Sequence, residues 1–116
     1  MLLIAMGFLV LAAILGLVLI INFFINKPMS VEVAIFHGMS AEAGFILVFV
    51  KAYYMNFSGL FILDLFLLAC AAMAGLSLVM LFHLRGKKLP LALVLAHATI
   101  GVVGFSMLAI KTFGGI

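Results

Sequence analysis

Four long apolar stretches dominate the sequence and leave few folds open to it. They cover residues 2–25, 31–54, 58–84 and 90–113. A helix of roughly 20 apolar residues crosses a hydrocarbon core of about 30 Å, and it satisfies its own backbone hydrogen bonds there. With 70% hydrophobic and 8% charged residues, a soluble domain of this size could not bury its apolar surface. We therefore expect an all-α membrane protein with four transmembrane helices.

Short polar segments separate the four stretches and have the composition of turns. Ser30 is a plausible N-cap for the second helix, and Pro90 suits the first position of the fourth. Such short connections place consecutive helices antiparallel to one another. The sequence therefore predicts a single domain, residues 1–116, folded as an up-down-up-down bundle of four helices.

The basic residues predict the orientation of this bundle. Four of them lie in the loops on one side and two lie near the other side: Lys27, Arg85, Lys87 and Lys88 against Lys51 and Lys111. The positive-inside tendency places the first group in the cytoplasm, so both termini face outward. We expect a bacterial inner (plasma) membrane protein in contact with lipid, and the scattered basic residues argue against nucleic-acid binding.

The second and fourth stretches share a pattern, H-x6-G-F-x5-K, at a spacing of 60 residues. Its members are His37, Gly44, Phe45 and Lys51 in one copy, and His97, Gly104, Phe105 and Lys111 in the other. The first and third stretches align only loosely. If the repeated unit is a helical hairpin, two parallel copies are related by a pseudo-two-fold axis along the membrane normal. This symmetry brings His37 and His97 to equal depth, where they can face one another across the bundle core.

Two facing histidines within a membrane are candidate ligands of haem iron. Ionisable residues inside a membrane are functional candidates by default, and each imidazole could supply one axial nitrogen. Small residues follow each histidine at spacings that share its helix face. They are Ser40, Ala41 and Gly44 after His37, and Gly101 and Gly104 after His97. This nearly bare face predicts a groove for a flat macrocycle.

In these residues the chain resembles transmembrane b-type cytochromes, which clamp haem between histidines of facing helices. The resemblance covers the two histidine helices and rests on His37, Gly44, His97, Gly101 and Gly104. Unlike the four-helix dihaem members, which need four ligands, this chain has three histidines. The resemblance implies one bis-histidine haem b and electron transfer, with quinone and other redox membrane subunits as partners.

The remaining polar residues leave several interpretations open. His83 and Arg85 are either interfacial side chains or partners of the haem propionates. Glu42 lies near the middle of the second stretch and is either protonated or paired. Asp64 lies at a depth similar to that of Lys51 and Lys111, and we expect it to pair with one of them.

Three functions compete at this stage. The first is a membrane cytochrome, acting alone or as an oxidoreductase subunit rather than as a stand-alone enzyme. The second is a non-redox accessory or assembly subunit in which the histidines only hold helices together. An oligomer of the chain stays open under each function. The third is a small transporter or proton path that uses Glu42 and Asp64.

Overall fold

A computed structural model describes residues 1–56 and 59–114, and its regular structure there is entirely helical. The helices are α1 (Leu2–Phe24), α2 (Val31–Tyr54), α3 (Gly59–Ser77), the π-helix η1 (Leu78–His83) and α4 (Leu91–Phe113). Four spans are long and apolar enough to cross a membrane, the third being formed by α3 and η1 together. The expected number of helices is confirmed and their placement is correct to within a residue in the described ranges; the expected start of the third at Ser58 lies outside those ranges. Pro90 was expected as the first residue of the fourth helix, but its backbone is extended and it is the N-cap, so α4 begins at Leu91.

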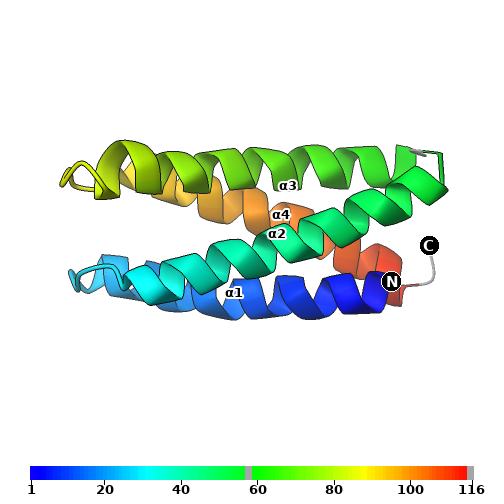
Figure 1. The fold of residues 1–116 in the computed structure, drawn as a ribbon, viewed down its shortest axis with the longest axis horizontal. Helices are drawn as coiled ribbons and strands as arrows, with labels where there is room; N and C mark the ends of the chain where they lie inside the picture. The colour runs from blue at the N-terminus through cyan, green and yellow to red at the C-terminus, as the bar shows by residue number, and fades with distance from the viewer. Residues whose placement is uncertain (57–58, 115–116) are drawn as a thin grey trace. The chain divides into compact units, whose positions relative to one another are not determined.

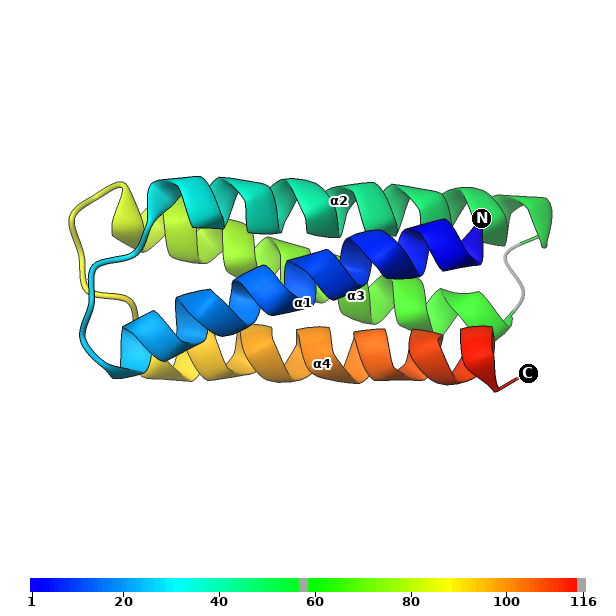
Figure 2. The same cartoon turned by 90° about the horizontal axis from the view of Figure 1, so that it is seen from below.

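Two helical hairpins make up the chain, and each is described by itself. The first comprises Met1–Asn56 and the second Phe57–Ile116. In the first, α1 and α2 run side by side in opposite directions, as Figure 1 shows in blue and in cyan to green. In the second, α3 packs against α4, which is orange to red in Figure 2, and η1 continues α3.

Side chains on the outer surfaces of these hairpins are largely apolar. Leu3 is 67% exposed, Phe66 is 63% exposed and Val102 is 63% exposed. Contiguous apolar surface of this kind is rare on soluble monomers, whereas hydrocarbon solvates it without cost. The exposure pattern therefore agrees with the length of the helices, and the chain has the character of an integral membrane protein.

Backbone geometry explains where the helices begin and end. The Ser30 side chain accepts a hydrogen bond from the Val33 N–H at 3.3 Å, which makes it the N-cap of α2 as expected. After α1, Asn26 has a φ of 60°, and the Lys27 N–H donates to the carbonyl oxygen of Asn22 at 2.9 Å. A left-handed residue followed by an N–H that donates to the carbonyl oxygen five residues earlier is a Schellman C-cap. This motif satisfies carbonyl groups at the end of the helix.

The second hairpin turns in the same way, with glycine at the left-handed position. Gly86 has a φ of 67°, and the Lys87 N–H donates to the carbonyl oxygen of Phe82 at 2.8 Å. Here the preceding turn is the π-helix η1, in which the hydrogen bonds span one residue more than in an α-helix. The third span therefore contains a local widening that its apolar sequence did not predict.

Candidate functional site

The His37 side chain in α2 forms a hydrogen bond with α1, the helix that packs against α2. It is the seventh residue of α2, and its Nδ1 lies 2.7 Å from the carbonyl oxygen of Ala12 in α1. A carbonyl oxygen can only accept a hydrogen bond, so Nδ1 carries the proton. In a neutral ring this tautomer puts the lone pair on Nε2. The contact thus fixes both the orientation and the chemistry of the imidazole.

A glycine one turn further along α1 makes room for this ring. A Cβ atom added at Gly16 would lie 2.9 Å from Cε1 of His37, closer than carbon atoms pack. Ala12 and Gly16 are four residues apart, so they lie on one face of the helix. Ala12 therefore supplies the hydrogen-bond acceptor, while Gly16 supplies the space that the imidazole occupies.

His97 has equivalent contacts in the second hairpin. It is the seventh residue of α4, and its Nδ1 lies 2.7 Å from the carbonyl oxygen of Ala71 in α3. A Cβ atom added at Gly75 would lie 2.8 Å from Cε1 of His97. Each hairpin thus holds one imidazole, as the same tautomer, by an alanine carbonyl and a glycine four residues later.

Leucine side chains lie against the glycines that were expected to line a groove. A Cβ atom at Gly44 would lie 2.6 Å from Cγ of Leu9, and one at Gly104 would lie 3.3 Å from Cδ2 of Leu68. The space beside these two glycines is therefore filled by the paired helix of the same hairpin. Their contact with haem stays a prediction.

The other three residues of the expected groove are partly or fully buried. Ser40 is buried, and Ala41 and Gly101 are half-buried. A Cβ atom at Gly101 would make only an ordinary contact, 3.9 Å from Cβ of Ala71. The face of α4 that carries Gly101 therefore lies toward α3, next to the alanine that binds His97.

His83 and Arg85 lie at the end of the third span. His83 is the last residue of η1 and is half-buried, while Arg85 is exposed in the following turn. Lys87 and Lys88 are exposed in the same connection. This end of the second hairpin is thus strongly basic, which suits either a propionate or anionic lipid.

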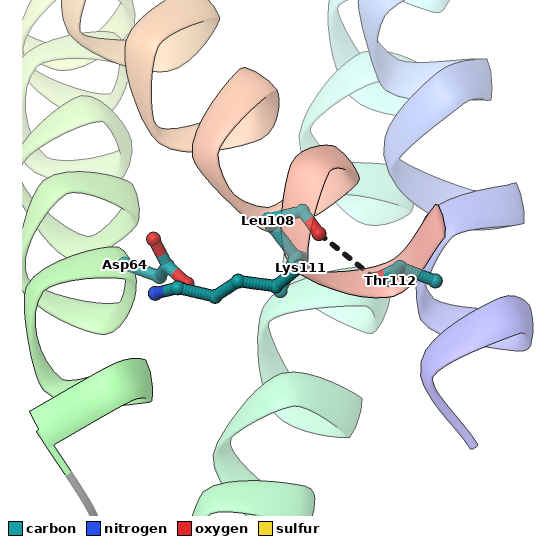
Figure 3. A network of polar contacts seen from close by, with 4 residues as sticks. All are labelled: Asp64, Leu108, Lys111 and Thr112. Atoms are coloured by element: carbon teal, nitrogen blue, oxygen red, sulfur yellow. Dashed lines mark hydrogen bonds and ion pairs between the residues drawn. The ribbon is translucent and has the colours of Figure 1, made fainter. Parts of the chain in front are cut away.

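An ion pair joins α3 and α4 near the other end of the second hairpin. The Lys111 ammonium donates to Oδ2 of Asp64 at 2.6 Å, as the expected pairing required. Figure 3 shows the Lys111 side chain reaching across to Asp64, while the neighbouring Thr112 hydroxyl donates to the carbonyl oxygen of Leu108. The Asp64 side chain is fully buried, and Lys111 also lies 5.8 Å from the ring centre of Phe61. The pairing of Asp64 with one of the two lysines is therefore confirmed, and the partner is Lys111.

The two carboxylates within the spans have different surroundings. Asp64 has no exposed surface, whereas Glu42 is exposed on α2. Lys51 is half-buried in the last turn of α2, at the position that Lys111 has in α4. The two hairpins therefore share their histidine contacts but differ in their charged residues.

Ala12 and Gly16 are the residues of this site that the sequence reasoning overlooked. The spacing A-x3-G was recognisable, because Ala12 and Gly16 have it as well as Ala71 and Gly75. This second repeat is out of step with the first, because the two alanine–glycine pairs are 59 positions apart while the two histidines are 60 apart. Such small-residue pairs are also common wherever membrane helices approach closely.

Comparisons with protein families, with characterised proteins and with solved structures gave no match for this chain. Function must therefore be argued from the site itself. Within residues 1–56 and 59–114, no three histidine, cysteine or carboxylate side chains gather into a metal-binding group. The chemistry open to each hairpin is that of one oriented imidazole, which can bind a metal through Nε2 or hold two helices together.

Proposed function

We propose that the chain is a membrane-embedded b-type cytochrome in which His37 and His97 ligate one haem b. It transfers electrons alone or as a subunit of a redox complex. The observation that carries this proposal is the hydrogen bond of each Nδ1 to an alanine carbonyl oxygen, at 2.7 Å in both hairpins. Metal-ligating histidines almost always donate their other ring N–H to a carbonyl, a carboxylate or water. The two histidines therefore fit the ligands that would hold haem iron through Nε2.

In this proposal the chain's own residues position the ligands. The carbonyl oxygens of Ala12 and Ala71 hold the two rings as one tautomer, and Gly16 and Gly75 let each ring lie close to the neighbouring backbone. The apolar hairpins exclude water from the imidazoles. Haem b, when bound, would supply a one-electron couple between ferric and ferrous iron. His83 and Arg85 would pair with its propionates.

The proposal includes the arrangement of the whole chain. The hairpins would be parallel copies of one unit in an up-down-up-down bundle, with His37 and His97 facing one another. The basic turns would lie in the cytoplasm of a bacterial cell, and both termini would face outward. Quinone and other membrane redox subunits would be the partners. The equivalent histidine contacts of the two hairpins support this arrangement.

A second candidate is a non-redox accessory subunit whose histidines join helices. It is favoured by the fact that each ring already lies against a glycine of the paired helix. An interhelical hydrogen bond of this kind contributes about 0.6–2 kcal/mol in a membrane. In that case the polar contacts would be complete within each hairpin, and the chain would act by binding neighbouring membrane proteins.

Absorption spectroscopy separates the two candidates. A cytochrome purified from cells supplied with haem should be red, with a Soret band that shifts on reduction. The band should disappear in His37→Ala and in His97→Ala, and it should survive in His83→Ala. A colourless preparation that is fully helical by circular dichroism would refute haem binding and leave the accessory subunit. A band that survives both ligand substitutions would refute these residues as ligands.

A further inference from the structure

The turn between the third and fourth spans carries three basic side chains at the end of an apolar hairpin. Arg85, Lys87 and Lys88 lie within four consecutive residues, and all three side chains are exposed. The sequence of the second hairpin contains a single acidic residue, Asp64, which already bonds to a lysine near the opposite end of that hairpin. The charges of residues 85–88, called the basic turn below, are therefore not neutralised within their own hairpin.

The turn of the first hairpin has the same backbone and the same exposure but a different charge. Each turn is closed by a Schellman motif at the same position. At a spacing of 60 residues, Lys27 corresponds to Lys87, while the exposed Ile25 and Pro28 correspond to the other two basic residues. Glu32 lies in the first turn of α2, whereas α4 has no acidic residue in its first turn. One base and one acid leave the first turn neutral overall, so it cannot offset the basic turn in any arrangement of the hairpins.

Apolar side chains flank the basic turn on both sides. Leu81 and Leu84 are exposed before it, and Leu91 is exposed after it at the start of α4. Positive charge thus lies directly beside apolar surface that its own hairpin leaves uncovered. An anionic phospholipid has the complementary order, with a negative headgroup next to its acyl chains. Basic residues at the end of a span attract such lipids, and an arginine can bind a phosphate through two parallel hydrogen bonds.

We propose that the basic turn binds the headgroup phosphate of an anionic phospholipid, while the flanking leucines contact its acyl chains. This inference goes beyond the proposed cytochrome function and does not depend on haem. Of the three basic residues, only Arg85 is assigned to a haem propionate in that function. Lys87 and Lys88 have no part in it, so they are the residues through which lipid binding is tested.

The experiment titrates phosphatidylglycerol or phosphatidylcholine of the same acyl chains into the full chain in detergent micelles. Nuclear magnetic resonance of the backbone amides gives the affinity and the location together. The amide signal of Gly86 in the basic turn should shift with phosphatidylglycerol and not with phosphatidylcholine. The signal of Asn26, at the same position of the first turn, should shift with neither lipid. Added KCl should weaken the effect on Gly86, because salt screens exposed charges.

The matched pair of variants is Lys87→Gln and Lys27→Gln, which remove one charge at the same position of the two turns. Lys87→Gln should weaken phosphatidylglycerol binding about fivefold, and Lys87→Gln/Lys88→Gln about 30-fold. Lys27→Gln should leave the binding unchanged, and Lys87→Arg/Lys88→Arg should retain it. These side chains are exposed, so the variants are expected to fold, and their spectra show whether they do.

Three results would overturn the proposal. The first is an equal response of Gly86 to the two lipids, and the second is an equal effect of Lys87→Gln and Lys27→Gln. The third is displacement of the lipid by inorganic phosphate beyond that caused by KCl at the same ionic strength, which would indicate a site for free phosphate. If the lysine variants fail to fold, the comparison of Gly86 with Asn26 in the wild type decides the question, and equal shifts of the two amides refute the site.

Discussion

Replacing Gly16 or Gly75 with alanine is expected to displace the histidine ring that lies against each glycine. The added Cβ would lie 2.9 Å from Cε1 of His37 and 2.8 Å from Cε1 of His97. Carbon atoms pack best at about 3.5–4.0 Å, so each ring must move by roughly 0.6–1.2 Å. The 2.7 Å hydrogen bonds of the imidazoles would then lengthen toward or beyond the useful limit of about 3.2 Å.

The energetic cost follows from the two contacts that are disturbed. Overpacking costs about 1–3 kcal/mol, and the loss of a hydrogen bond between membrane helices adds about 0.6–2 kcal/mol. Alanine gains up to about 1 kcal/mol over glycine in helix propensity. Gly7→Ala is the control that removes this last effect, because a Cβ atom there meets nothing within 4 Å. We expect Gly16→Ala to be less stable than Gly7→Ala by about 2–4 kcal/mol.

Unfolding in mixed detergent micelles, followed by circular dichroism, measures this difference. Nitrogen NMR of the histidine ring adds a readout that a purely structural change would not move, because it reports which ring nitrogen carries the proton. Gly75→Ala should have the same effect on His97. Its control is Gly38→Ala in α2, where an added Cβ atom meets nothing within 4 Å. Equal stabilities of Gly16→Ala and Gly7→Ala, with the Nδ1 proton unchanged, would refute the proposed role of these glycines.

Two further predictions concern the second hairpin. Asp64→Asn should lower stability in detergent by up to about 3 kcal/mol, because it leaves the Lys111 ammonium without its counter-charge, and Asp64→Asn/Lys111→Met should recover part of the loss; unchanged stability of the single variant would contradict the ion pair. Deletion of Met80 from η1 should be tolerated, with a helical signal and Tm close to the wild type, since it gives Gly75 and Gly86 the spacing of Gly16 and Asn26. Deletion of Met73 is the control, because it shortens the spacing of Ala71 and Gly75 from four residues to three, which turns them out of the arrangement that holds His97 and should destabilise the hairpin.

Helix boundaries were predictable from the sequence because lipid leaves the backbone few alternatives. Apolar length sets each span, and local turn residues end it. The predicted range of α2 is correct to the residue, and Ser30 caps it as expected. The pairing of Asp64 with a lysine was also accessible, because a carboxylate at that depth requires a nearby cation.

The direction in which each histidine points was not accessible from its own helix. Periodicity placed His37 on the same face as Ser40 and Gly44, but it could not show that this face lies toward α1 at His37 and Gly44. That result depends on which apolar face of α1 has the smallest side chains. Because nearly every residue of α1 is apolar, hydropathy does not show which of its faces packs against α2. Only the positions of the small residues Ala12 and Gly16 indicate that face.

The π-helix accounts for the change of spacing between the two hairpins. Ala71 and Gly75 follow Ala12 and Gly16 by 59 positions, whereas Gly86 follows Asn26 by 60. One extra residue in an α-helix would rotate everything after it by about 100° and advance it by about 1.5 Å. Because the wider turn of η1 takes up that residue, the left-handed turn at Gly86 and the contact of His97 with Ala71 keep the geometry of the first hairpin. The π-helix therefore has a structural role, because it allows His97 to keep its hydrogen bond to Ala71.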